Sequence, residues 1–221
     1  MAGMQDFATF KDDFWGADTF STAGQGTPWA IADTSSSGAP TYATVSPSAT
    51  GEVALTLAAT SEVENVCLSF GDVLCFDVDN LISFETRLKV TGCTTGTTIA
   101  WGLASARNDT PGSIANRALF RMTGATSTTA VTVETDDATT DSGLIATGST
   151  LATVYKKFYI DFAGGKSNVK FYIDGQRVAA STTFSIAGFS ASFQPFFQIQ
   201  KAANTNVDAI TIDYVAVEMK R

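Results

Sequence analysis

The 221-residue sequence contains no histidine. Histidine commonly activates a nucleophilic serine or cysteine, and it is the commonest protein ligand of transition metals. Its absence excludes Ser–His and Cys–His catalytic pairs, histidine-ligated metal centres and proton transfer through an imidazole. Any chemistry in this chain must use carboxylates, hydroxyls, thiols, amides or cations.

Charged residues are also scarce, and the basic ones form no cluster. Asp, Glu, Lys and Arg together make up 16% of the chain, and the net charge is −8. Nucleic-acid binding needs clustered cations that neutralise phosphates, so we expect no nucleic-acid partner. No apolar run approaches the roughly 20 residues that span a bilayer, and the N-terminus has no basic segment followed by an apolar one. We therefore expect neither a membrane segment nor a secretory signal.

The three cysteines, Cys67, Cys75 and Cys93, have no CxxC spacing, which argues against a zinc site or a complete disulfide framework. If Gly71-Asp72 forms a two-residue hairpin turn, Cys67 pairs with Phe76, and the sulfurs of Cys67 and Cys75 lie on opposite faces. A three-residue loop would instead allow a disulfide between them. The alternative is buried free thiols in a reducing compartment.

The sequence is rich in segments where apolar and polar residues alternate with a period of two, which is typical of half-buried strands. The clearest covers residues 81–90, and residues 53–57 show the same pattern. The inward face of the first segment is expected to be Ile82, Phe84, Thr86, Leu88 and Val90, and its outward face Ser83, Glu85, Arg87 and Lys89.

Two further segments carry turn and bulge signals. Asp174-Gly175 predicts a type I′ hairpin turn that pairs Phe171 with Val178 and Tyr172 with Arg177. In the last strand, Ile210, Ile212 and Tyr214 share one face, but residues 215–217 are apolar on both faces. Either cover on both sides or a β-bulge would explain that change.

About a dozen such short strands, with Gly, Asn and Asp turns between them and no helix alternating with them, predict an all-β fold of the sandwich or barrel type. We predict a single β-sandwich domain over residues 12–221, preceded by an N-terminal arm over residues 1–11. Phe7, Phe10 and Phe14 also fit a short amphipathic helix. The alternative is that Phe14 and Trp15 begin the first strand.

The order of the segments resembles the concanavalin A-like jelly rolls, the group of laminin-G-like modules, legume lectins and laminarinase-type glycoside hydrolases. The resemblance spans residues 12–219, and it implies a two-sheet antiparallel jelly-roll sandwich. The matching segments are DDFWG (12–16), Trp29, GEVALTL (51–57), FETRLKV (84–90), IAWGLAS (99–105), KFYIDF (157–162), VKFYIDGQRV (169–178), PFFQIQ (195–200) and ITIDYVAVE (210–218).

The resemblance also implies a test for an enzyme. The hydrolases of this group carry Glu-x-Asp-x-x-Glu on one strand, where one carboxylate acts as nucleophile and another as general acid. The nearest match is Glu134-Thr135-Asp136, and the third carboxylate is missing because Ala138 and Thr139 follow. Glu62 and Glu64 form the other close pair. We interpret both pairs as acids that flank turns, and we predict no enzyme.

Two kinds of binding site remain as hypotheses. Oxygen ligands for a structural calcium ion occur in two short stretches, but the spacing of a known calcium loop is absent, so no cofactor is predicted. These oxygens belong to Asp77, Asp79, Asn80, Asp136, Asp137 and Asp141. A glycan site would combine Trp101 with the loop residues Arg107, Asn108 and Asp109. The alternative for Trp101 is a place in the core.

The resemblance extends to the sandwich modules of phage structural proteins, and it implies a virion protein that decorates or cements the capsid of a tailed phage. The expected partners are the major capsid protein and like subunits, as a homotrimer on the capsid surface, after synthesis in the host cytoplasm. Phe7 and Phe10 are the candidate interface residues. The polar stretches 104–117 and 135–150 are other candidate contacts. The alternative function is a carbohydrate-binding module on a phage fibre or cell surface.

Overall fold

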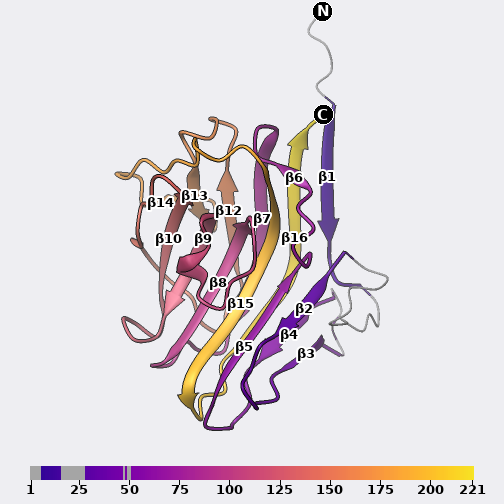
Figure 1. Ribbon diagram of the computed structural model, residues 1–221, viewed down its shortest axis with the longest axis vertical. Helices are drawn as coiled ribbons and strands as arrows, with labels where there is room; N and C mark the ends of the chain where they lie inside the picture. Colours follow the sequence, from indigo (N-terminus) through magenta and orange to yellow (C-terminus); the bar gives the residue numbers. More distant parts are fainter. Residues whose placement is uncertain (1–5, 16–27, 47, 49–50) are drawn as a thin grey trace, which may run out of the picture.

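The computed structural model describes residues 6–15, 28–46, 48 and 51–221. Within these residues the chain forms sixteen strands and one short 3-10 turn, η1 (Pro111–Ser113). The strands build two antiparallel sheets stacked face to face (Figure 1), which confirms the all-β jelly-roll sandwich. No helix in the described part of the chain is long and apolar enough to cross a membrane.

Sheet A contains eight strands, and its central strand pairs are long. The strand order is β14-β13-β12-β7-β16-β4-β3, and β1 also pairs with β16. The strands are β1 (Phe7–Asp12), β3 (Thr41–Thr44), β4 (Val53–Thr56), β7 (Leu81–Val90), β12 (Lys156–Asp161), β13 (Lys170–Ile173), β14 (Gln176–Val178) and β16 (Ala209–Lys220).

Sheet B also contains eight strands. The strand order is β11-β10-β9-β8-β15-β5-β2, and the short β6 pairs with β15. The strands are β2 (Ala30–Asp33), β5 (Glu62–Ser69), β6 (Phe76–Asp77), β8 (Thr97–Ala104), β9 (Asn116–Thr123), β10 (Ala130–Asp137), β11 (Ile145–Thr150) and β15 (Ser192–Asn204).

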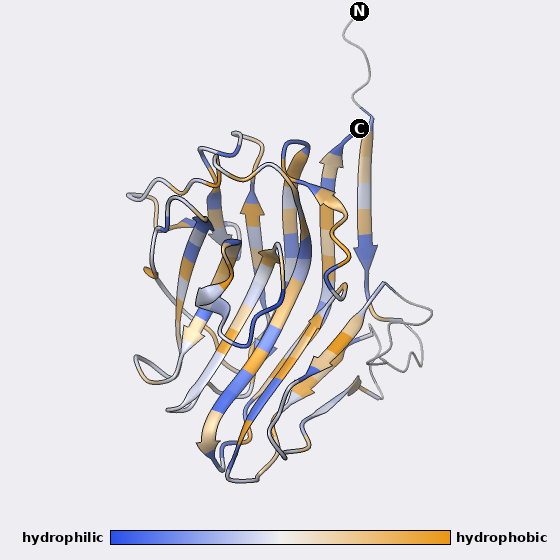
Figure 2. Ribbon diagram, viewed as in Figure 1, coloured by the Kyte–Doolittle hydropathy of each residue, from blue (hydrophilic) through white to orange (hydrophobic). Residues whose placement is uncertain are grey.

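The core lies between the sheets and is rich in phenylalanine. Figure 2 shows hydrophobic and hydrophilic residues alternating along several strands, as the period-two pattern requires. Trp101 of β8 is fully buried, stacks on Phe120 of β9 with ring centroids 5.8 Å apart, and meets the edge of Phe158 from sheet A. Aromatic contacts of this kind join the two sheets across the sandwich.

The hairpin around Asp174-Gly175 is confirmed. Phe171 pairs with Val178 and Tyr172 with Arg177. Both turn residues have positive φ, 49° and 78°, as a type I′ turn requires.

The expected bulge in the last strand is also present, and it changes the face on which Tyr214 lies. The pairing of β16 with β7 shifts between Ile212 and Tyr214. Because one extra residue is inserted there, Val215 and Val217 join Ile212 in the core, and Tyr214 lies on the outer face of sheet A. The prediction that Tyr214 shares the face of Ile212 is therefore wrong. A similar shift near the start of β7 buries Leu81 more fully than Ile82.

The N-terminal segment is a strand, so the short helix that its phenylalanine spacing also fitted does not form. Residues 7–12 form β1, which pairs antiparallel with β16, so the predicted boundary at residue 12 cuts through the sheet. Phe14 does not begin a strand, because its φ is +51°. The backbone reverses there, and the Asp12 carboxylate accepts hydrogen bonds from Phe14 N and Trp29 Nε1 at 2.8 and 2.7 Å. Residues 1–5 of the predicted arm lie outside the described residues.

The predicted hairpin between Cys67 and Cys75 does not form. Gly71 and Asp72 make a turn with positive φ, but β5 pairs with β2 and β15, and β6 pairs with β15. All three cysteines are free, as the alternative interpretation expected, although Cys75 is exposed. Burial raises the pKa of the Cys67 and Cys93 thiols to about 12.

These thiols should differ in reactivity. We expect iodoacetamide at neutral pH to add one label per native chain, at Cys75, because the thiolate is the nucleophile and the other two thiols are buried and protonated. Intact-mass spectrometry measures the labels. Cys75→Ser should abolish labelling of the native protein, while the unfolded wild type should take three labels. Labelling of Cys67 or Cys93 in the native Cys75→Ser variant would contradict the buried positions.

Candidate functional site

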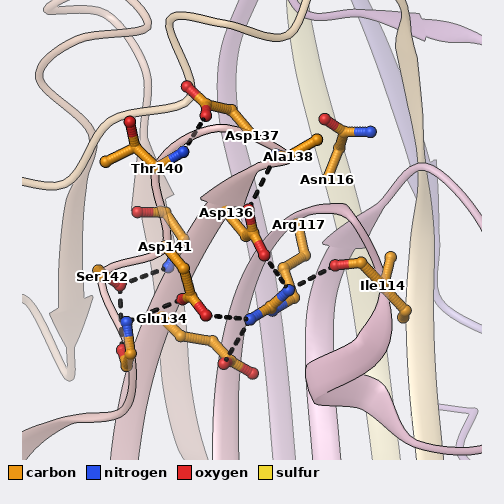
Figure 3. Close-up of polar contacts among 12 residues, drawn as sticks. Ile114, Asn116, Arg117, Glu134, Asp136, Asp137, Ala138, Thr140, Asp141 and Ser142 are labelled. Carbon is orange, nitrogen blue, oxygen red and sulfur yellow. Dashed lines mark hydrogen bonds and ion pairs between the residues drawn. The ribbon is translucent and has the colours of Figure 1, made fainter.

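A group of five charged side chains lies on the outer face of sheet B, over β9 and β10 (Figure 3). Arg117 of β9 is at its centre and is only 2% exposed. Its guanidinium lies 3.2 Å from the Glu134 carboxylate, 2.6 Å from Asp136 and 3.3 Å from Asp141. Arg121 reaches the other oxygen of Glu134 at 3.4 Å. Two arginines and three carboxylates therefore form one ion cluster, which we call the Arg117 cluster.

The register of the two strands creates this cluster. Arg117 pairs with Asp136, and Arg121 pairs with Thr132, so Glu134 lies between the two arginines on the neighbouring strand. Residues two apart on a strand share a face, and Arg117, Leu119 and Arg121 therefore line the outer face of β9. The buried residues between them, Ala118 and Phe120, point into the core.

A loop covers this part of the sheet. Residues 105–115 leave β8 and fold back over the outer face, where Ile114 packs on Leu119, Ala104 and Phe196. The Ile114 carbonyl accepts a hydrogen bond from Arg117. The Asp109 carbonyl accepts hydrogen bonds from Gln198 at 2.9 Å and Asn65 at 3.3 Å. This segment, which we call the covering loop, is thus held by both apolar and polar contacts.

The electrostatics of the cluster favour its charged form. Burial opposes the charge on Arg117, but Glu134, Asp136 and Asp141 together raise its pKa above the ordinary value. The arginine stays protonated, and each carboxylate is held next to a cation.

The interpretation that both acidic pairs flank turns is correct for one member of each pair and wrong for the other. Asp136 accepts a hydrogen bond from Ala138 N in the turn after β10, and Glu62 begins β5 directly after a bend. Glu134 is 2% exposed and lies within β10, and Glu64 is fully buried within β5. Glu64 accepts hydrogen bonds from Ala58 N and Thr60 Oγ1 and lies 3.6 Å from the ammonium of Lys201, which is also fully buried. Lys201 donates hydrogen bonds to backbone carbonyls, including Thr60 O at 2.8 Å.

The candidate glycan residues are not brought together. Trp101 lies in the core, as its alternative interpretation stated, and its side chain is not accessible to a sugar. Arg107 and Asp109 lie in the covering loop and form an ion pair with each other. Asn108 Oδ1 accepts a hydrogen bond from Thr110 N at 2.9 Å, which shapes the loop. The polar part of the predicted site therefore has no aromatic partner from Trp101.

The two candidate interface phenylalanines differ in exposure. Phe7 is 49% exposed, whereas Phe10 packs on Trp29, Phe70 and Phe76 with ring centroids 5.3–6.2 Å apart. Only Phe7 is accessible to a partner. The stretch 135–150, predicted as a second contact loop, contains β11 and the end of β10.

The residues considered for calcium have other partners. Asp136 and Asp141 contact Arg117, Asp79 pairs with Lys166, and Asp77 accepts a hydrogen bond from the Asn80 side chain at 2.7 Å. Within the described ranges, no group of three or more Cys, Asp or Glu side chains is arranged to hold a metal ion.

Asp137 lies at the end of β10 and is 5% exposed. Its carboxylate accepts hydrogen bonds from the backbone N–H of Gly188 and Thr140, both at 2.7 Å, and of Thr139 at 3.1 Å. Desolvation opposes the charge, but these hydrogen bonds dominate and lower the pKa of Asp137. Asp137 therefore fastens the 185–189 loop to sheet B.

One hollow lies beside β9, β10 and β11. Its volume is about 250 Å³, and no charged side chain lines it. The lining residues are Thr123, Thr126, Ser127, Ala130, Thr132, Leu144 and Ala146. It offers apolar surface and hydroxyls, but no group suited to acid–base chemistry.

Sequence reasoning missed Arg117 and Arg121, the residues that decide the state of the acids. The signal was present, because the two arginines are four residues apart on a strand pattern and must share a face. What the sequence does not reveal is that this strand lies next to β10, in a register that brings the arginines to Glu134.

No protein-family model matches the sequence, and a comparison with curated proteins also finds no match. Solved structures do resemble this one. A β-glucanase of Bacillus licheniformis matches with a TM-score of 0.64 and 15% identity, over 95% of this chain and 97% of that chain. The Emp47p carbohydrate recognition domain matches with a TM-score of 0.58 and 13% identity, over 88% and 89%.

A carbohydrate esterase of the Shiga toxin-encoding bacteriophage phi24B matches with a TM-score of 0.50 and 16% identity, over 93% of this chain and 100% of that chain. Glycoside hydrolases of family 16 are also among the similar structures. These likenesses confirm the concanavalin A-like jelly roll predicted from the order of segments. At such low identities they show the fold and not the activity.

Replacement of Arg117 tests the ion cluster. Arg117→Met should lower the free energy of unfolding by about 3–5 kcal/mol, because Glu134 stays buried and keeps only its contact with Arg121. Urea denaturation measures the loss. The control is Arg177→Met at an exposed position of the edge strand β14, which should change stability by less than about 0.5 kcal/mol. Equal effects of the two substitutions would contradict the cluster's structural role.

The Asp137 anchor should give a pH-dependent contribution to stability. Its pKa is lower in the folded state, so the carboxylate stabilises the fold above pH about 4, and this contribution is lost as the pH falls through the folded-state pKa. Asp137→Asn should lower the melting temperature at neutral pH, and its deficit relative to wild type should shrink in acid. Calorimetry over a pH series measures both curves. A deficit that is independent of pH would contradict the anchor.

Proposed function

We propose that this protein is a non-enzymatic structural component of a virus particle, a decoration or cement protein on the capsid surface of a tailed phage. Its partners would be the major capsid protein and like subunits. Its work would be done by surfaces that bind neighbouring proteins, and not by a reaction. The observation that carries the non-enzymatic part is the neutralised and covered acid pair on sheet B.

A glycoside hydrolase needs two carboxyl groups with different tasks, one protonated to donate a proton and one free to attack or to activate water. Glu134 and Asp136 do not fit these tasks. Both contact Arg117, and Glu134 also contacts Arg121. The hydrolase alternative, which the similar structures raise, has no support in this arrangement.

A structural role is supported by the surface. Several large apolar side chains are exposed at separate places on the described surface, where a neighbouring protein could cover them. The most exposed are Trp15, Val73, Val154 and Val207, with exposed fractions of 52–72%. One structure with the same fold comes from a bacteriophage, which shows that phage genes use it.

Carbohydrate binding is the second candidate function, and one observation favours it. The covering loop presents Asn108 and Asp109 at the surface, and one similar structure is a carbohydrate recognition domain. Such a site would work through amides and carboxylates without Trp101. A glycan array with the purified chain tests this candidate. The wild type should bind a glycan, and Asn108→Ala should lose that binding. A blank array would remove it.

The main proposal is tested on particles of the phage that encodes the chain. Antibodies against the purified protein, detected with gold in electron micrographs of purified particles, should label the capsid surface evenly. Particles made without the gene should also break at a lower temperature than complete ones. A protein absent from purified particles, or found only on the tail, would contradict a decoration role.

A further inference from the structure

We propose that two copies of this chain associate through the free edge of β1, with the two β1 strands antiparallel across a two-fold axis at Thr9. The contact would continue sheet A from one copy into the next. This inference concerns association of the chain with itself and goes beyond the proposed function.

The backbone of β1 offers hydrogen-bonding groups on its free edge. Asp6 lies opposite Arg221 in the same register as β1 and β16, and Arg221 N donates to Asp6 O. Directly opposed residues that share a hydrogen bond alternate along an antiparallel ladder with pairs that share none. Ala8, Phe10 and Asp12 therefore bond to β16, and the N–H and C=O groups of Phe7, Thr9 and Lys11 point away from it. Among the described residues, no backbone group bonds to this edge.

The other strand edges are less suited to pairing. Sheet A ends at β14 and β3, and sheet B ends at β11 and β2. β14 has 3 residues, and β2 and β3 have 4 each. β11 has 6 residues but pairs irregularly and contains Gly148 at φ 74°. β1 has 6 residues in continuous register, without Gly, Pro or a bulge. Long regular edges are the ones that recruit another strand.

A second copy of the same strand fits this edge in one register better than in others. With Thr9 opposite Thr9, Phe7 lies opposite Lys11 on both sides of the axis, and all three residues with free backbone groups are paired. Thr–Thr pairs and a cation beside an aromatic ring are favourable across strands, while Asp6 of each copy lies opposite Asp12 of the other and opposes pairing at the two ends. A shift by two residues in either direction leaves one of the three without a partner.

Within the described ranges, no strand of this chain pairs beyond β1. Beside residues 209–212 of β16, sheet A continues through β4 to β3, whereas beside residues 215–220 it ends at β1. The edge is therefore stepped, and a second β1 would occupy the step beyond β1. Figure 1 shows β1 at the margin of the sandwich, with the strands β4 and β3 below it. The half-exposed ring of Phe7 lies on this step.

Sedimentation velocity of the purified chain over a wide range of concentration tests the proposal. The wild type should show a monomer–dimer equilibrium. Thr9→Pro should remove the dimer without unfolding β1, because the lost N–H points away from β16 and proline is tolerated on an edge strand. Thr9→Glu and Thr9→Lys should each weaken the dimer by roughly tenfold or more, because like charges then meet on the axis. An equal mixture of these two variants should form dimers again.

The matched control is Thr41→Glu, at an exposed position of β3 on the same sheet, which should leave the equilibrium unchanged. Far-ultraviolet circular dichroism confirms that each variant is folded. A wild type that stays monomeric would overturn the proposal, and so would a trimer, the form expected from the resemblance to phage proteins. Dimers that persist in Thr9→Pro, or a Glu–Lys mixture that stays monomeric, would also overturn it. None of these outcomes tests whether the protein lies on a capsid.

Discussion

The structure of the outer face of sheet B depends on the ion cluster around Arg117. A buried carboxylate is tolerated only with a partner, and here Glu134 has two arginines. The same guanidinium donates a hydrogen bond to the Ile114 carbonyl. One side chain therefore both pairs with the acids and holds the covering loop in place. In this arrangement each of the three carboxylates contacts Arg117, which positions them on the outer face of sheet B.

The buried pair of Lys201 and Glu64 follows the same principle elsewhere in sheet B. Lys201 bonds to the carbonyls of residues that connect β4 and β5, and Glu64 bonds to the amide and hydroxyl of the same connection. A side chain at Gly38 would collide with Glu64, because a Cβ there would lie 2.2 Å from its Oε1. Glycine at that position leaves space for Glu64 to pair with Lys201. The buried ion pair therefore holds the β4–β5 connection against sheet B.

Local patterns predicted the fold well where a single segment contains the whole signal. The 171–178 hairpin depends only on its turn residues and on alternation, and both are local. The face of Tyr214 was not predictable, because the bulge near Asp213 is a property of the pairing with β7. The Cys67–Cys75 hairpin failed for the same reason, since β5 has better partners in β2 and β15. The partners of Glu134 likewise depend on which strands become neighbours.

The central place of β16 in sheet A has a consequence for the order of folding. This strand alone joins β7, β4 and β1, and it lies after all of them in the chain. During synthesis the earlier strands must therefore wait, with apolar faces uncovered, until the residues from Ala209 onward have left the ribosome. Contacts between residues as distant as Phe7 and Lys220 make folding slow and leave intermediates prone to aggregation. Chaperones that shield strand edges during this interval should matter more for this chain than for a protein whose central strand is made first.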